Sequence, residues 1–196
     1  MILSLSHIQT KLSNYQYTPI RWQAPLPPQR AAVAIILRFH RSAPDVLLMK
    51  RVAHIQDRWS GQISFPGGKA SDPEEPALAI AIRETQEELG LDLTQNAQCI
   101  GSIDEIQAIS RGKFLPMIIQ PFVFVQTTEA VLTLSSEAEA TIWLPLEQVV
   151  AGTLDATYTY ENSEPSPLRF PCWNYQGYSI WGLTYKMLAR FLAIIA

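Results

Sequence analysis

The chain has 196 residues, of which 47% are hydrophobic and 17% charged, and it carries a formal net charge of −3. This length suits one domain with terminal additions, and the composition is that of a globular protein, which excludes global disorder. The slightly acidic balance provides no basic surface for a phosphate backbone, so nucleic acid is not an expected partner.

The cysteines and the N-terminus carry no signal for export or membrane insertion. Cys99 and Cys172 stand in no metal-binding spacing and are expected to be free thiols. The start, MILSLSHIQTKL, lacks a basic segment followed by an apolar one, and no apolar run approaches the roughly 20 residues that span a bilayer. We therefore expect a cytoplasmic protein with no membrane partner.

In chain order, the first predicted element is a short helix over residues 1–12, where apolar side chains recur at helical spacing. The proline-rich segment at residues 25–30 stops regular structure. This pattern divides the chain into an N-terminal helical and proline-rich appendage, residues 1–29, and a main domain, residues 30–196.

Several short apolar runs predict a sheet. Residues 31–39 and 45–51 are separated by HRSAP and are expected to pair as strands. The proline-rich stretch at residues 163–171 is predicted to be a long loop, and residues 179–196 have the pattern of an amphipathic helix. Further strands are predicted at residues 97–106, 120–126 and 140–146. Together these elements predict an α/β sandwich.

A central helix is predicted over residues 72–89, with Pro73 near its start and Gly90 at its end. Ile80 is an exception to its amphipathic pattern, because it falls among the acidic residues. The other apolar positions share one face, which is predicted to pack on the core: Leu78, Ile82 and Leu89.

Three carboxylates, Glu84, Glu87 and Glu88, stand in an i, i+3, i+4 relation and therefore share one face of this helix. Like charges at this spacing destabilise a helix unless a cation compensates them. A set of oxygen donors suits Mg²⁺, which commonly binds one or two carboxylates together with phosphate oxygens. A solvated helix face is the competing interpretation of such acids.

The segment just upstream, SFPGGK, places Gly67 and Gly68 where a strand is expected to end. Glycine lets the backbone approach a ligand closely, so a carbonyl group here could reach a metal ion. A pair of glycines alone indicates no more than a turn. The combination of this turn with the spacing of the glutamates favours a phosphate-directed metal site.

Residues 68–91 resemble the Nudix box, written G-x5-E-x7-R-E-U-x-E-E-x-G-U with U an aliphatic residue. Thr85 stands in place of an aliphatic residue. The spacing between the box glycine and Arg83 is one residue longer than usual, so Glu74 or Glu75 could be the isolated glutamate, and counting back from Arg83 favours Glu75. The resemblance implies a Nudix α/β/α sandwich with a mixed β-sheet.

By this resemblance, the metal site for Mg²⁺ or Mn²⁺ comprises the carbonyl group of Gly68 and the carboxylates of Glu84, Glu87 and Glu88. Arg83 completes the implied catalytic set and is expected to pair with the isolated glutamate and with Glu87. The general base is Glu84 or a loop acid, for which Glu137 and Glu139 are the candidates.

The flanks of the box are similar to those of coenzyme A pyrophosphatases: residues 47–51, residues 59–68 and residues 180–184 carry this second resemblance. Met49 and Val52 depart from that subfamily's pattern. Candidate substrate-binding residues are Arg51, Gly67 and Lys69. Trp59 could stack on an adenine, although packing is the favoured interpretation, and Trp181 is expected in the core.

These patterns predict metal-dependent hydrolysis of the diphosphate linkage of a nucleoside diphosphate derivative, with coenzyme A or acyl-coenzyme A as the leading substrate. ADP-ribose, dinucleotides and nucleoside triphosphates are the alternatives. A ligand-binding regulator without turnover is less favoured because the full set of box residues is present. The expected partner is therefore a small nucleotide derivative. The oligomeric state is open, and a homodimer is one candidate.

Overall fold

The computed structural model describes residues 3–23, 25–40, 43–55, 59–110, 113–160 and 167–196. Its helices are α1 (Leu5–Ser13), α2 (Ala77–Leu89), α3 (Leu93–Asn96), α4 (Leu146–Val150) and α5 (Gly182–Ile194). Its strands are β1 (Gln29–His40), β2 (Ala43–Arg51), β3 (Ile63–Ser64), β4 (Gly67–Lys69), β5 (Ala97–Ser102), β6 (Ile106–Ser110), β7 (Lys113–Gln126), β8 (Ala138–Pro145), β9 (Asp155–Tyr160), β10 (Leu168–Tyr175) and β11 (Tyr178–Ile180).

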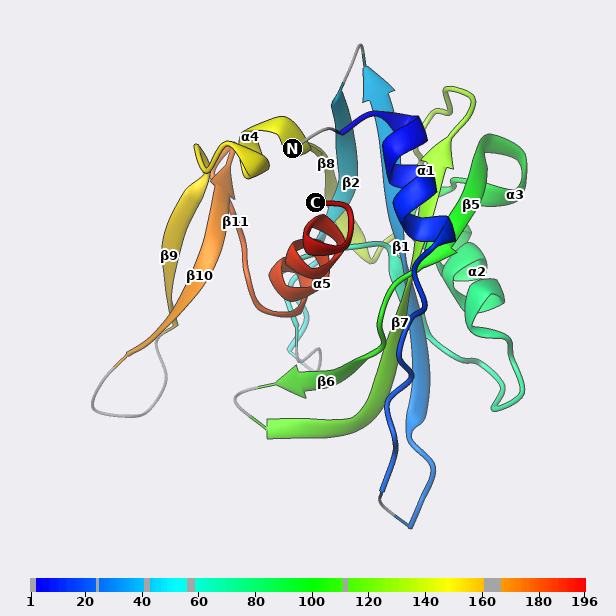
Figure 1. Ribbon diagram of the computed structural model, residues 1–196. Helices are drawn as coiled ribbons and strands as arrows, with labels where there is room; N and C mark the ends of the chain where they lie inside the picture. The colour runs from blue at the N-terminus through cyan, green and yellow to red at the C-terminus, as the bar shows by residue number, and fades with distance from the viewer. Residues whose placement is uncertain (1–2, 24, 41–42, 56–58, 111–112, 161–166) are drawn as a thin grey trace.

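The main sheet is mixed and has eight strands, with the order β3-β2-β1-β7-β5; β4 also pairs with β1, β6 with β7, and β8 with β2. The central strands β1 and β7 run parallel, whereas β1 and β2 are antiparallel. A second sheet has the order β11-β10-β9 and lies to one side of the first (Figure 1).

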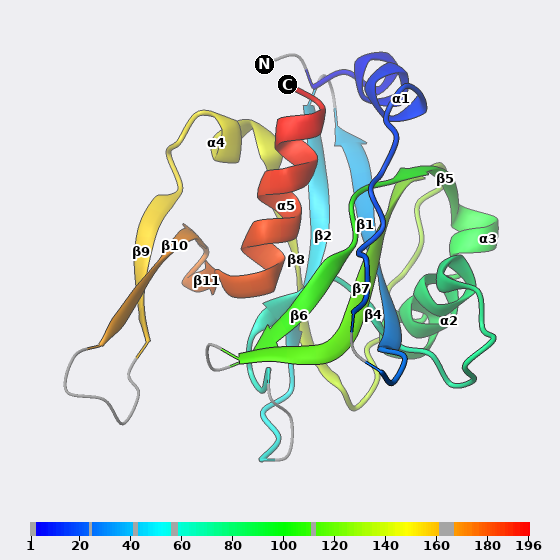
Figure 2. The same ribbon diagram turned by 60° about the horizontal axis from the view of Figure 1, so that its bottom comes forward.

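Both faces of the main sheet are buried, which explains why β1 is a continuous apolar run. Successive side chains of a strand point to opposite faces. The even-numbered residues Ala32, Ala34 and Ile36 contribute to the core under α2, and the odd-numbered residues Ala31, Ile35 and Leu37 to the core under α1 and α5. Figure 2 shows α2 and α5 on the two sides of the sheet. The predicted α/β/α sandwich with a mixed sheet is confirmed.

The central helix is shorter than the sequence pattern suggested. It begins at Ala77, not near residue 72, and Pro76 is its N-cap residue in an extended conformation. The acidic residues before it belong to a turn, because the carboxylate of Glu75 accepts hydrogen bonds from the backbone N–H and the hydroxyl of Ser71. Its end is as predicted: Gly90 has a φ of 65°, in the left-handed region that favours glycine.

The predicted core face of α2 was wrong in part, since Leu89 is fully buried as predicted. Ile80 is fully buried, whereas Leu78 and Ile82 are only partly buried beside the core. Residues four apart lie on one face, so Glu84 and Glu88 continue the stripe of Ile80 and also point toward the sheet. Burial of these acids is possible because β4, beneath them, contains two glycines.

Two strand predictions also need correction. Residues 97–106 form β5 and the start of β6, separated by a break at residues 103–105. Part of the predicted loop at 163–171 belongs to β10, which pairs with β9 in the second sheet; residues 163–166 lie outside the described residues. The signal for β10 was obscured because Pro167 and Pro171 interrupt its pattern.

The N-terminal segment packs on the main domain. Ile8 and Leu12 of α1 are buried in the same core as α5. Beyond α1, the hydroxyl of Tyr15 donates to the carboxylate of Asp104 at 2.6 Å, and Arg190 of α5 donates to the same carboxylate. The break between β5 and β6 therefore anchors both ends of the chain.

Cys99 and Cys172 are free, as expected. Among the described residues, no helix is both long and apolar enough to cross a bilayer.

Candidate active site

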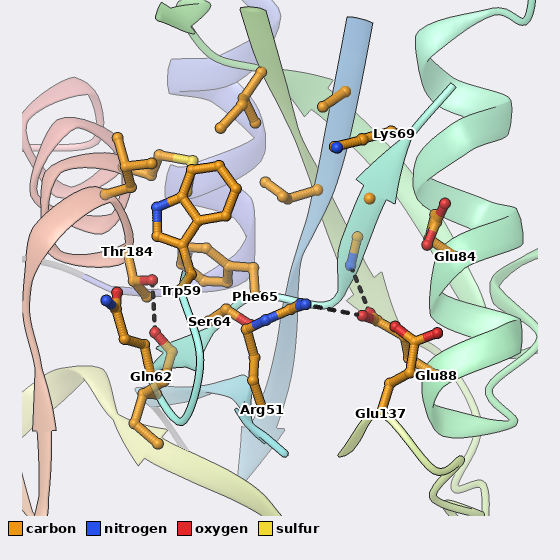
Figure 3. A pocket seen from close by; sticks show the side chains of 18 of the residues that line it. Arg51, Trp59, Gln62, Ser64, Phe65, Lys69, Glu84, Glu88, Glu137 and Thr184 are labelled. Carbon is orange, nitrogen blue, oxygen red and sulfur yellow. Dashed lines mark hydrogen bonds and ion pairs between the residues drawn. The ribbon is translucent and has the colours of Figure 1, made fainter. Parts of the chain in front are cut away.

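A cavity of about 520 Å³ lies between the acidic stripe of α2, the β4 turn and the first turn of α5. Its two ends differ in chemistry. One end is lined by carboxylates and two cationic side chains, and the other by aromatic and aliphatic groups (Figure 3). The site is therefore built by segments from three distant parts of the chain.

The glycine turn and the glutamates are in direct contact. The backbone N–H of Gly67 donates to Oε2 of Glu88 at 2.8 Å. A Cβ atom on Gly68 would lie 2.3 Å from the carboxylate carbon of Glu84, so only glycine leaves room for that side chain. Gly67 has a φ of 147°, and a Cβ there would collide with the carbonyl of Ala32. The backbone contact requires glycine at position 67, whereas a larger residue at position 68 would displace the flexible end of Glu84.

Arg83 organises the acidic end. Its Nε and Nη2 donate to the two carboxylate oxygens of Glu75, at 2.8 and 3.2 Å. Nη2 also donates to the carbonyl of Lys69, and Nη1 donates to Glu84 and Glu87. The pairings with Glu75 and Glu87 expected from the resemblance are present. Bidentate contact of this kind fixes a side chain firmly, so Arg83 links the turn before α2 to the β4 turn and the helix.

The acidic residues differ in their exposure. The side chain of Glu88 is 4% exposed, that of Glu84 is 18% and that of Glu87 is 58%. Burial raises the pKa of Glu88 to about 7, despite the hydrogen bond from Gly67 and the positive charge of Arg51. Burial likewise raises the pKa of Glu84, against the hydrogen bond from Arg83. The cations beside them, Arg83 at Glu84 and Arg51 at Glu88, offset only part of the cost of this burial.

Glu75 contrasts with these two residues. The hydrogen bonds from Arg83 lower its pKa to about 2, helped by those from Ser71. Its carboxylate therefore remains ionised and bound to Arg83 near neutral pH. This difference separates a glutamate that holds the box together from the two that face the cavity.

Three further charged residues surround the acidic end. Nη1 of Arg51 lies 3.6 Å from Oε1 of Glu88, and the guanidinium points across the cavity toward it (Figure 3). Lys69 lines the cavity from β4. Glu137 also lines it, and its charge raises the pKa values of Glu84 and Glu88. Glu139, the second loop acid considered, instead binds Lys50 at 2.7 Å.

The apolar end is built mainly by residues that the sequence pattern did not single out. Leu183 and Met187 enter it from α5 and Met117 from β7. Trp59 also lines it, packs against the core and donates from Nε1 to the carbonyl of Ile109 at 3.4 Å. Thr184 secures this wall, because its buried hydroxyl donates to the carbonyl of Ile63 at 2.8 Å. The early signals were the apolar spacing of residues 179–196 and the second resemblance at residues 59–68 and 180–184, neither of which pointed to Met117.

Trp181 has a different position from Trp59. It is not among the lining residues of the cavity, and it stacks on Tyr158 with ring centroids 4.2 Å apart. Tyr160 and Phe170 complete this aromatic cluster. Trp181 is only partly buried, so the expected core position holds in part.

The acidic end fits a hard divalent cation. Within the part of the chain that the structure describes, no group of acidic, histidine or cysteine side chains already forms a metal shell. Arg83 holds Glu84 and Glu87, while Glu88 faces Gly67. If Glu84 and Glu87 turned to bind a cation, Arg83 would keep its hydrogen bonds to Glu75 and to the carbonyl of Lys69. The buried carboxylates of Glu84 and Glu88, whose charges are offset only in part by Arg83 and Arg51, give such a cation a favourable environment.

Comparison with known proteins adds a sequence relationship to this geometry. A family model described as the NUDIX domain matches residues 27–164. A protein of Schizosaccharomyces pombe is 31% identical over 164 residues, which are 74% of this chain and 50% of that protein. This chain thus spans about half the length of that relative. The Nudix hydrolase NudL of Salmonella paratyphi B is 28% identical over 169 residues, 85% of this chain and 82% of NudL.

A solved structure shows the same fold. The MutT/nudix family protein from Enterococcus faecalis matches 98% of this chain and 68% of its own with a TM-score of 0.52, at 16% sequence identity. At this identity the likeness concerns the architecture alone.

Proposed function

Because this chain belongs to the Nudix family of diphosphate-hydrolysing enzymes, we propose that it cleaves the diphosphate linkage of coenzyme A or an acyl-coenzyme A. The observation that carries this proposal is the division of the cavity. A diphosphate would occupy the end with the carboxylates and cationic groups, and the remainder of the substrate would extend between Trp59, Leu183 and Met187.

We propose that Glu84, Glu87, Glu88 and the carbonyl of Gly68 hold Mg²⁺ or Mn²⁺. Such a cation supplies charge neutralisation on the diphosphate and lowers the pKa of bound water. Arg83 is a positioning residue in this scheme, since its contacts join Glu75, Lys69 and the glutamates. Lys69 and Arg51 lie where they can bind phosphate oxygens, and the backbone N–H of Gly67 donates to Glu88 beside them.

For the general base, the structure favours Glu137 over Glu84. The carboxylate of Glu84 accepts a hydrogen bond from Arg83 and is assigned to the cation in this scheme, so it is less available to accept a proton from water. Glu137 is exposed on the cavity wall, with its backbone fixed by the bond from Val52 N–H to its carbonyl. It can therefore take a proton from a water molecule placed beside the diphosphate.

The apolar end favours a pantetheine arm over a second ribose. That arm is long and largely apolar, with amide groups, whereas a ribose presents hydroxyls that an aliphatic wall cannot bind. Met117, Leu183 and Met187 offer no hydrogen bonds at this end. The hydroxyl of Thr184 already donates to Ile63, so toward the cavity it can only accept a hydrogen bond.

The test compares kcat/KM for coenzyme A and ADP-ribose under identical Mg²⁺ and Mn²⁺ conditions, with products identified. We expect coenzyme A to be the better substrate and to give an adenosine diphosphate and a phosphopantetheine fragment. An equal or higher value for ADP-ribose would overturn the substrate proposal. Absence of turnover across coenzyme A, ADP-ribose, dinucleotides and nucleoside triphosphates would instead indicate a ligand-binding regulator.

A matched pair of variants tests the apolar wall. Leu183→Gln places an amide in the cavity and should raise KM for coenzyme A about tenfold, in line with 1–3 kcal/mol for a lost apolar contact. Leu26→Gln makes the same change at a residue that is 77% exposed and should leave KM unchanged. Equal KM values for wild type and Leu183→Gln would show that the arm binds elsewhere.

A further inference from the structure

Strand β9 forms an edge of the second sheet, since the described strands of that sheet have the order β11-β10-β9. Both ribbon views show its outer side facing away from the rest of the molecule (Figures 1 and 2). Its residues, DATYTY, include neither lysine nor proline and strongly favour an extended conformation. Edge strands of monomeric proteins normally carry such protective residues or a bulge, because an open edge pairs readily with another strand.

The hydrogen-bond pattern identifies which groups of β9 are available. In an antiparallel pair, bonded and non-bonded positions alternate. The backbone N–H of Asn174 donates to the carbonyl of Leu154 at 2.9 Å, so the even-numbered residues of β9 and β10 bond to one another. Thr157 and Thr159 therefore direct their N–H and C=O groups outward, whereas the N–H of Asp155 donates to the carbonyl of Gly152 at 3.3 Å. Pro171, which has no N–H, lies opposite Thr157 at a non-bonded position, consistent with this pattern.

We propose that β9 pairs antiparallel with β9 of a second copy of this chain, joining the two small sheets across a two-fold axis at Thr157. In this register, Thr157 faces Thr157 of the second copy and Asp155 faces its Thr159. The N–H groups of Thr157 and Thr159 can then donate to the carbonyls of Thr157 and Asp155 of the second copy, and the two-fold axis repeats both bonds.

Side-chain size and charge favour a second copy as the occupant. In the proposed register, Tyr158 lies opposite Ala156 of the second copy, which places a large side chain against a small one on the partly buried face. On the other face, Arg169 lies beside Thr159, and Asp155 of the second copy lies on its far side. Because of the two-fold symmetry, this attraction between Arg169 and Asp155 of the other copy occurs twice.

The pairing also places corresponding faces of the two small sheets on the same side. Antiparallel pairing about Thr157 keeps even-numbered residues opposite even-numbered ones, so the aromatic faces of both copies lie on the same side. Tyr158 and Tyr160, which contact Trp181, would then form part of one larger aromatic surface across the junction. A peptide of unrelated sequence would need the same alternation of side chains between its two faces to extend this aromatic surface.

The decisive variant is Thr157→Pro, which removes an outward N–H while leaving the bonded positions of β10 untouched. Its matched control is Thr157→Val, which keeps the N–H and the preference for a strand. Sedimentation velocity of the full chain should give twice the 22.0 kDa chain mass for wild type and Thr157→Val, and the single chain mass for Thr157→Pro. Near-ultraviolet circular dichroism checks that each variant is folded.

Two further measurements keep the test decisive if Thr157→Pro fails to fold. Arg169→Glu changes an exposed side chain and should weaken dimerisation at least tenfold. Hydrogen exchange of wild type should protect the amides of Thr157 and Thr159 at high protein concentration and release them on dilution. A monomeric wild type, a dimer that survives Thr157→Pro, or exchange that is independent of concentration would overturn the proposal.

Discussion

Glu88 receives the backbone N–H of Gly67 in a 2.8 Å hydrogen bond, although the two residues lie 21 positions apart in the sequence. This bond ties α2 to the glycine turn and orients a carboxylate that is almost completely buried. The same contact holds the acidic end of the cavity together. Because a backbone N–H carries no net charge, it does not fully compensate the negative charge of Glu88.

The stability of the metal-free protein should fall as pH rises between about 5 and 8. The folded-state pKa of Glu88 is raised from 4.5 to about 7, so the native state binds more protons than the unfolded state in this window. Glu88→Gln should remove this dependence, which amounts to up to about 3 kcal/mol. Urea unfolding at several pH values in EDTA measures it, with Glu74→Gln as the control at an exposed residue. Parallel pH profiles for wild type and Glu88→Gln would contradict the prediction.

Removal of divalent metal should abolish hydrolysis, because the diphosphate and the buried carboxylates repel each other without a cation. EDTA treatment followed by addition of Mg²⁺ or Mn²⁺ should eliminate and then restore turnover. A melting curve recorded with and without metal provides an independent readout, since binding to the folded state raises Tm. Full activity in metal-free buffer would exclude the proposed role of the cluster.

Glu87→Gln should lose turnover by about 100-fold or more while the metal-free protein keeps its Tm within a few degrees. The carboxylate of Glu87 is 58% exposed and its ion pair with Arg83 is a surface contact, which contributes at most about 1 kcal/mol. Kinetics and melting of the same samples separate the two effects. Glu74→Gln serves again as the control and should match wild type in both. A large fall in Tm for Glu87→Gln would assign this residue a structural role.

Glu137→Gln should lower kcat by about 100-fold or more if this residue is the base, in line with the contribution of general base catalysis. Glu139→Gln is the matched control, because Glu139 lies two residues further along the chain, in β8, but binds Lys50. Metal titration of both variants should give affinities close to wild type, since neither residue is among the proposed ligands. Equal kcat values for Glu137→Gln and wild type would return the role of base to Glu84.

The sequence alone determined much of this protein. The even and odd residues of β1 were both apolar, which is the pattern of a strand buried on two faces, and the structure covers both faces. The spacing of Arg83, Glu84, Glu87 and Glu88 identified the acidic end, and counting back from Arg83 selected Glu75 over Glu74, as its two hydrogen bonds confirm. These features are local, because helix and strand geometry set them over a few residues.

Only the tertiary structure decided which way the acidic face points and what surrounds the substrate. The amphipathic pattern of α2 suggested that the acids face away from the core, yet Glu88 is buried with Ile80, because the glycines of β4 leave space beneath them. The apolar wall combines Met117 with Leu183, and it includes Trp59 but not Trp181. Such choices depend on contacts between residues far apart in the chain, and no pattern within one helix or strand contains them.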